Sequence, residues 1–299
     1  MRITNTAWKA PTLTAELGKL VDRARERERQ VRFLLENESA RQVDVVRRLI
    51  VGDAADACAP PLDTQLPLED LCERALEARG PLDRGVERKH LRERARLHLH
   101  LSRGEWRLDA PADLLVLWDV ATRREPLVRN FIDEPRWRTA DDIVPFTGAR
   151  SAWLFGIQPL RPESATADPC DIASLVNSIV SFVRESDLPP ELVACGVEFP
   201  MLFTHPFVDG NGHTTRLLTC DLLHKAGYSV ASLLALIDCL HEVRPQVSQM
   251  VKGVVMRDAS SEEFVAFYMG RLLAAQERVR ARVVGKGYKI PVGGKSIIA

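Results

Sequence analysis

Apolar residues recur at helical spacing along most of this chain, and that periodicity constrains the fold more than any other feature. Pro169 and Asp171 open the clearest example. Its apolar stripe consists of Ile172, Leu175, Val176, Ile179 and Val183. Similar patterns predict helices near residues 14–49, 68–78, 91–101, 190–202, 212–225, 230–240 and 244–255, and after a capping box at 260–263. The sequence therefore predicts an all-α fold.

One segment departs from the helical pattern. Two short apolar stretches, residues 143–146 and 152–157, flank a Gly-Ala-Arg-Ser turn, which is typical of a β-hairpin. The apolar side chains that we expect on this hairpin include Ile143, Val144, Trp153, Leu154 and Phe155. A small hairpin is therefore expected to accompany the helices.

The same patterns suggest three regions along the chain. Residues 1–125 are predicted to form an N-terminal helical region of unknown role, and residues 126–284 a helical core. Residues 285–299 are rich in glycine and lysine and are predicted to form a flexible tail.

Composition limits the class of protein. The 41 basic and 41 acidic side chains cancel, so no nucleic-acid partner is predicted. The six cysteines include no C-x-x-C pair, which argues against a structural zinc site and indicates reduced thiols. No apolar run of about eighteen residues is present, so no membrane span is predicted. Because the N-terminus lacks an apolar signal segment, we expect a cytoplasmic protein, or an effector exported without a cleaved signal.

The most specific stretch of the sequence runs from His205 to Arg216 and reads His-Pro-Phe-Val-Asp-Gly-Asn-Gly-His-Thr-Thr-Arg. A predicted helix starts within it, and free backbone N–H groups at a helix start form a natural anion site. Gly210 and Gly212 let a phosphate approach the backbone closely, and the Asn211 amide can add a donor. Arg216 can reach the same anion with its planar guanidinium.

Two further residues of the stretch suggest chemistry. A lone carboxylate beside phosphate oxygens is a common way to hold Mg²⁺, so Asp209 is the predicted metal ligand. Histidine titrates near neutral pH, so His205 is the predicted general base for an attacking hydroxyl. Each residue alone is more often an ordinary turn or loop residue. Their combination at a helix start favours a nucleotide phosphate site.

This segment resembles the signature of the Fic family (Fic/Doc superfamily), His-x-Phe-x-Asp/Glu-Gly-Asn-Gly-Arg-x-x-Arg. The matching residues are His205, Phe207, Asp209, Gly210, Asn211, Gly212 and Arg216. The resemblance covers roughly residues 125–280. It implies an all-α core with a β-hairpin flap at 143–157 that docks the target segment. It also implies transfer of a nucleoside monophosphate, usually AMP from ATP, to a Ser, Thr or Tyr hydroxyl of a target protein.

The resemblance assigns roles to individual residues of the segment. His205 would be the base and Asp209 the Mg²⁺ ligand. The nucleotide-binding residues would be Gly210, Asn211, Gly212, His213 and Arg216. His213 is a departure, because the family has its first arginine there. Since histidine lacks arginine's permanent charge and paired donors, we expect weaker binding of the terminal phosphates, altered nucleotide preference or reduced activity.

Regulation is not settled by the sequence. Many members of the family carry an inhibitory Ser/Thr-x-x-x-Glu-Gly/Asn helix whose glutamate blocks the second arginine. Residues 12–16 have this spacing, but Leu17 replaces the Gly or Asn. An unrecognised helix within residues 1–120, a separate inhibitory chain, and no inhibition are all left open.

Two alternative functions are also open. A Fic-like enzyme could transfer a different phosphate-containing group, although the Doc-like branch has Lys where Gly212 stands. Alternatively, His213 could mark a decayed site in a non-catalytic binding module. The retained His205 and Asp209 favour an enzyme, because a binding module has no need of a base.

Overall fold

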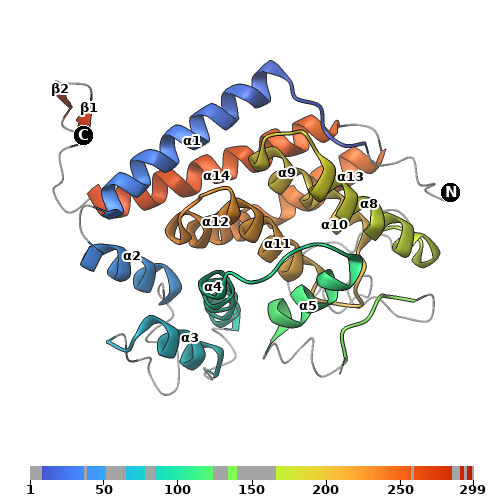
Figure 1. Ribbon diagram of the computed structural model, residues 1–299, viewed down its shortest axis with the longest axis horizontal. Helices are drawn as coiled ribbons and strands as arrows, with labels where there is room; N and C mark the ends of the chain where they lie inside the picture. The colour runs from blue at the N-terminus through green and yellow to red at the C-terminus, as the bar shows by residue number, and fades with distance from the viewer. Residues whose placement is uncertain are drawn as a thin grey trace.

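The computed structural model describes residues 9–36, 39–51, 63, 65–77, 85–123, 134–139, 166–256, 259–284, 290–292 and 295–297, a few of them by their backbone alone. Helices make up most of these residues, which confirms the predicted all-α fold (Figure 1). The N-terminal helices are α1 (Ala15–Glu36), α2 (Ser39–Val51), α3 (Leu68–Glu77), α4 (Gly85–Arg103) and α5 (Pro111–Thr122). The remaining helices are η5 (Pro169–Asp171), α8 (Ile172–Glu185), α9 (Pro190–Gly196), α10 (Glu198–Thr204), α11 (Asn211–Lys225), α12 (Val230–Glu242), α13 (Arg244–Met256) and α14 (Ser261–Val284).

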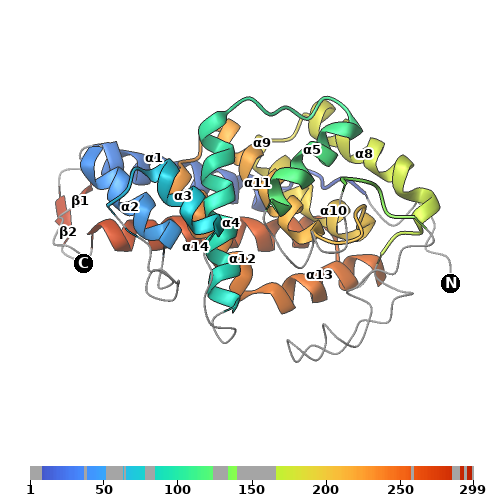
Figure 2. The same ribbon diagram turned by 90° about the horizontal axis from the view of Figure 1, so that it is seen from below.

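The long helices α1 and α14 lie side by side and form one layer of the molecule, with α12 packed against α14 (Figure 1). Helix α4 runs across the molecule and contacts α2, α3, α11 and α12 (Figure 2). One hydrophobic cluster extends through these layers and includes residues from Leu17 on α1 to Val283 on α14. The N-terminal helices and the helices after residue 166 therefore share a core.

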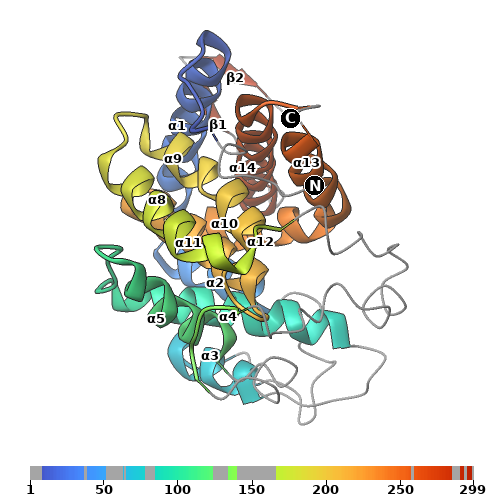
Figure 3. The same ribbon diagram turned by 90° about the vertical axis from the view of Figure 1, so that its right-hand side faces the viewer.

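Helix α11 lies inside this arrangement and carries the second half of the His205–Arg216 stretch. It packs against α4, α5, α9, α10 and α12 (Figure 3). Two-thirds of its residues are buried, including Leu217, Leu218 and Leu223. It closes at Gly227, which has a φ of 95° and follows the helix end as a glycine cap. The packing fixes the helix start at one place in the molecule.

Several predicted boundaries are refined by the structure. The pattern over residues 14–49 corresponds to two helices, α1 and α2, rather than one. The segment around Gly196 and Pro200 forms two short helices that meet at Val197. The predicted capping box is confirmed, because Ser260 Oγ accepts from the Glu263 backbone N–H at 3.1 Å and Glu263 Oε2 accepts from the Ser260 N–H at 2.8 Å.

The predicted hairpin at 143–157 lies outside the described residues. A different two-stranded antiparallel ribbon is described near the C-terminus, where β1 (Ile290–Val292) pairs with β2 (Lys295–Ile297). It falls within the segment predicted to be a flexible tail, and that flexibility stays a prediction. Among the helices described, none is both long and apolar enough to cross a membrane.

Candidate active site

The loop between α10 and α11 is bounded by two residues with left-handed backbone conformation. His205, with a φ of 48°, ends α10, and Gly210, with a φ of 81°, directly precedes α11. Glycine is required at 210, because a Cβ there would lie 2.5 Å from Thr122 Cγ2 and 2.8 Å from Trp118 Nε1. This turn leads into the first residues of α11, whose N–H groups have no acceptor inside the helix.

Asn211 closes the loop with its side chain. Its Nδ2 donates to the Phe207 carbonyl at 2.8 Å, and its Oδ1 accepts from the Phe207 N–H at 2.9 Å. Phe207 is fully buried, with ring centroids 5.3 Å from Trp137 and 5.9 Å from Trp118. Both ends of the Asn211 amide are thus engaged within the loop, and its contact with a phosphate stays a prediction.

Helix α5 supports the loop from outside the recognised motif. Trp118 Nε1 donates a hydrogen bond to the Asp209 carbonyl at 2.7 Å. The apolar spacing does not predict this helix. A signal does exist, because Pro111 stands at its first position and Asp113 accepts from backbone N–H groups just before it.

Arg138 is a second residue that the motif does not include. Its backbone N–H donates to the Pro206 carbonyl at 2.7 Å, and its Nε donates to the His205 carbonyl at 3.0 Å. Its Nη2 donates to the carbonyls of Ala167 and Thr204 at 2.9 and 3.3 Å. Arg138 is only 5% exposed, so these bonds form in the interior beside the predicted base.

The surroundings of His205 suit a base. Burial lowers the pKa of its imidazole to about 4, and the positive charge of Arg138 acts in the same direction. A hydrogen bond to the Leu202 backbone partly opposes them. The ring is therefore neutral at pH 7, and with one nitrogen bonded to that carbonyl the other is able to accept a proton.

Asp209 is partly exposed, and its Oδ1 accepts from the Gly210 N–H at 2.6 Å. In the part of the chain that the structure describes, no group of three or more His, Cys, Asp and Glu side chains could hold a metal ion. An ion at Asp209 would therefore depend on oxygens from a substrate and from water. A single carboxylate completed by phosphates fits the usual coordination of Mg²⁺.

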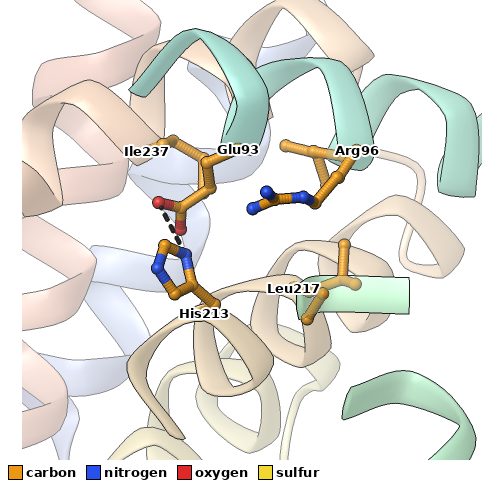
Figure 4. A pocket seen from close by; sticks show the side chains of 7 residues that line it. Glu93, Arg96, His213, Leu217 and Ile237 are labelled. Atoms are coloured by element: carbon orange, nitrogen blue, oxygen red, sulfur yellow. Dashed lines mark ion pairs between the residues drawn. The ribbon is translucent and has the colours of Figure 1, made fainter. Parts of the chain in front are cut away.

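A buried carboxylate on α4 binds the cationic side of the motif. Glu93 Oε1 lies 2.6 Å from Arg216 Nε, and Glu93 Oε2 lies 3.1 Å from His213 Nδ1 and 2.9 Å from His241 Nε2. In Figure 4, Glu93 and His213 point toward each other from α4 and α11 in a small pocket, with Arg96 beside them. The structure thus brings Arg216 and His213 together on one acidic partner.

The charge of Glu93 is maintained by its neighbours. Burial raises its pKa, but Arg216, His213 and His241 outweigh burial and hold the pKa well below its ordinary value. Arg244, the first residue of α13, is close enough for Arg216, Glu93 and Asp209 all to influence its pKa, which burial lowers. Glu93 therefore stays ionised and neutralises Arg216 in this conformation.

Gly212 makes room for that arrangement. A Cβ at this position would lie 3.2 Å from Arg216 Nη1, so the arginine folds back over the start of its own helix. The described residues of the predicted site thus fall into two neighbouring groups, the loop with His205 and Asp209, and the Glu93 cluster. The predicted flap side chains lie outside the described residues.

Comparison with known proteins agrees with this geometry. The family model described as Fic/DOC family matches residues 130–223, which include the whole loop and most of α11. The resemblance to the Fic/Doc superfamily is thereby confirmed for this part of the chain.

Particular relatives extend the comparison. The chain is 40% identical over 63 residues to the protein adenylyltransferase Fic of Drosophila virilis and 38% identical over 63 residues to that of Drosophila willistoni. Each match covers 20% of this chain and 13% of the relative, so the chain spans only a small part of these proteins. A Fic family protein from Desulfovibrio desulfuricans G20 shares the fold with a TM-score of 0.61 at 18% identity, over 93% of this chain and 78% of that one.

Proposed function

We propose that this chain is a Fic-like nucleotidyltransferase. It moves AMP, or another nucleoside monophosphate, from a Mg²⁺-bound nucleotide such as ATP to a Ser, Thr or Tyr hydroxyl of a target protein. The observation that carries the proposal is the neutral His205, held at one end of a loop whose other end opens the glycine-led start of α11. The names of the curated relatives support the same reaction.

The proposed reaction begins at the target hydroxyl. The free nitrogen of His205 accepts the hydroxyl proton as the oxygen attacks the α-phosphorus of the nucleotide. A new P–O bond forms to the target, and the bond from the α-phosphorus to the bridging oxygen breaks. Pyrophosphate leaves with that oxygen. The N–H groups at the start of α11 stabilise the negative charge of the phosphates throughout.

Asp209 would hold Mg²⁺, which when bound neutralises phosphate charge and steadies the leaving group. The Trp118 bond to the Asp209 carbonyl and the Gly210 N–H bond to Asp209 Oδ1 keep this residue in place. Arg216 would bind phosphate oxygens with two parallel donors once it is released from Glu93.

Glu93 holds Arg216 in a state in which the arginine pairs with a carboxylate instead of a phosphate. Its Oε1 lies 2.6 Å from Arg216 Nε, so a phosphate that binds Arg216 through this nitrogen must compete with the carboxylate for the same donor. This contact fits the option of a restraining helix within the first 120 residues, supplied by α4 without the family's inhibitory motif. It lowers nucleotide affinity, because part of the binding free energy is used to separate the pair.

The test is transfer of label from nucleotide to protein. The parent and a His205→Ala variant are incubated with Mg²⁺, a cell lysate and ATP, GTP, CTP or UTP, each labelled at the α-phosphate. We expect labelled bands with the parent and none with His205→Ala. His224→Ala is the matched control, because His224 lies in the last turn of α11 and bonds the Tyr228 carbonyl.

The same panel separates the alternatives. Absence of any His205-dependent band, combined with no Mg²⁺-dependent nucleotide binding in calorimetry, would identify a binding module and end the proposal. A band that appears only with a donor of another phosphate-containing group would move the reaction to that group.

A further inference from the structure

We propose that Arg138 is a positioning residue that fixes the left-handed turn carrying His205. The proposal rests on the proposed function of the His205 site. It is carried by the hydrogen bonds of one buried guanidinium to the end of α10.

The end of α10 needs an outside partner. The last carbonyls of a helix find no N–H donor within the helix, and His205 leaves the helical conformation directly after Thr204. Arg138 donates to both carbonyls, at 3.3 Å to Thr204 and 3.0 Å to His205. A cation at a helix C-terminus also interacts favourably with the helix dipole.

The guanidinium joins three parts of the chain. Its Nη2 reaches the Ala167 carbonyl at 2.9 Å, and the Ala167 N–H in turn donates to the Phe203 carbonyl at 2.9 Å. The backbone N–H of Arg138 adds a bond to Pro206 at 2.7 Å. The residues on both sides of His205 are therefore held from the same direction.

This arrangement explains how a strained residue persists. A left-handed backbone at a residue other than glycine costs about 1–2 kcal/mol, and such residues persist when their surroundings over-determine them. The fork of Arg138 supplies donors in a fixed plane that a lysine cannot reproduce. Fixing the backbone of His205 fixes the direction in which its imidazole leaves the chain.

The same guanidinium acts on the imidazole through its charge. Among the described residues, Arg138 is the charged side chain whose field lowers the pKa of His205, together with burial. Arg136 offers a comparison, because it is exposed and its Nη1 donates to the Trp137 carbonyl at 3.4 Å. The comparison with Arg136 thus tests whether the position and charge of Arg138 matter, and not merely the presence of a nearby arginine.

The experiment compares Arg138→Gln with Arg136→Gln in the full chain. The titration of the His205 ring is followed by NMR, with its signal assigned from a His205→Asn spectrum, and transfer is measured against pH. In Arg138→Gln we expect the His205 midpoint to rise by about one unit or more and kcat to fall roughly tenfold or more, with the KM for nucleotide little changed. Arg136→Gln should match the parent in every measurement.

Other results overturn the proposal. An Arg138→Gln protein that is less stable but keeps the parental His205 midpoint and kcat gives Arg138 a structural role only. If that variant does not fold, Arg138→Lys takes its place and should keep the low midpoint but lose kcat; parental kcat in it refutes the proposal. If the His205 midpoint shifts in Arg138→Gln but the parent protein labels no target, the positioning role of Arg138 is supported and the proposed function is refuted. If the parent labels a target but the midpoint does not shift, the proposed function is supported and the positioning role is refuted.

Discussion

Glu93 determines how the charges of the candidate site balance. It is a nearly buried carboxylate with three nitrogen partners from α11 and α12, and Arg216 and the two histidines keep it ionised. His213, which departs from the family signature, is one of those partners. A histidine in this place pairs with Glu93 and leaves Arg216 as the sole arginine of the motif.

Replacing Glu93 by glutamine should loosen this restraint. Without the carboxylate, Arg216 is free to bind phosphate, and we expect nucleotide affinity to rise about tenfold, which corresponds to about 1.4 kcal/mol. The free protein should lose about 3 kcal/mol of stability, because a partly buried arginine is left without its carboxylate partner. Calorimetry and unfolding with and without Mg²⁺-nucleotide measure both effects.

The control for this variant is Glu73→Gln. It removes a carboxylate that lies outside the motif and pairs with Arg123 at an N–O distance of 3.4 Å. It should leave affinity unchanged. Equal or weaker nucleotide binding by Glu93→Gln would contradict the view that Glu93 restrains the site.

At the scale of elements, a second buried carboxyl joins the helices behind the loop. Glu198 on α10 accepts from Thr219 Oγ1 of α11 at 2.8 Å and from the Tyr268 hydroxyl of α14 at 3.2 Å. Burial raises the pKa of Glu198 to about 7, and these hydrogen bonds and Arg216 limit the rise. We therefore expect the contact between α10, α11 and α14 to be sensitive to pH.

The raised pKa predicts a pH-dependent stability. Between about pH 4.5 and 7 the folded protein keeps a proton that the unfolded chain releases, so this stabilisation is lost as pH rises through that window. The loss amounts to about 3 kcal/mol. Denaturant unfolding at pH 5 and pH 8 measures the effect. Between these pH values the free energy of unfolding should fall by less in Glu198→Gln than in the parent, and the difference should be about that amount. Parallel pH curves for variant and parent would contradict this reading.

The elements also show what the sequence could and could not predict. Helices such as α8 and α14 were predictable, because apolar spacing and caps are local signals. The turn into α11 was predictable because Asp209, Gly210 and Asn211 are consecutive, whereas the chemistry of this loop stays a prediction. Arg138 and Glu93 were not, because Arg138 contacts His205, 67 positions away, and Glu93 contacts Arg216, 123 positions away. Glu93 lies among other charged residues of α4, which resemble a solvated helix face until the fold buries it.

At the scale of the whole molecule, two helices from the N-terminal region, α4 and α5, contact the candidate site. Helix α4 contributes Glu93, and α5 contributes Trp118, while α1 packs along α14 in the shared core. The likeness to the Desulfovibrio desulfuricans protein covers 93% of the chain and so includes most of this region. Within the fold, α5 supports the motif loop and α4 pairs with its arginine.

The central claim is that His205 promotes transfer of a nucleotidyl group. It is tested most directly by giving the protein one nucleotide labelled at either the α- or the γ-phosphate, with Mg²⁺ and a protein acceptor from lysate. The proposed mechanism predicts that α-label enters the acceptor, that γ-label leaves with pyrophosphate, and that His205→Ala stops both. Acceptor labelled from the γ-position, or α-labelling that persists in His205→Ala, would contradict it.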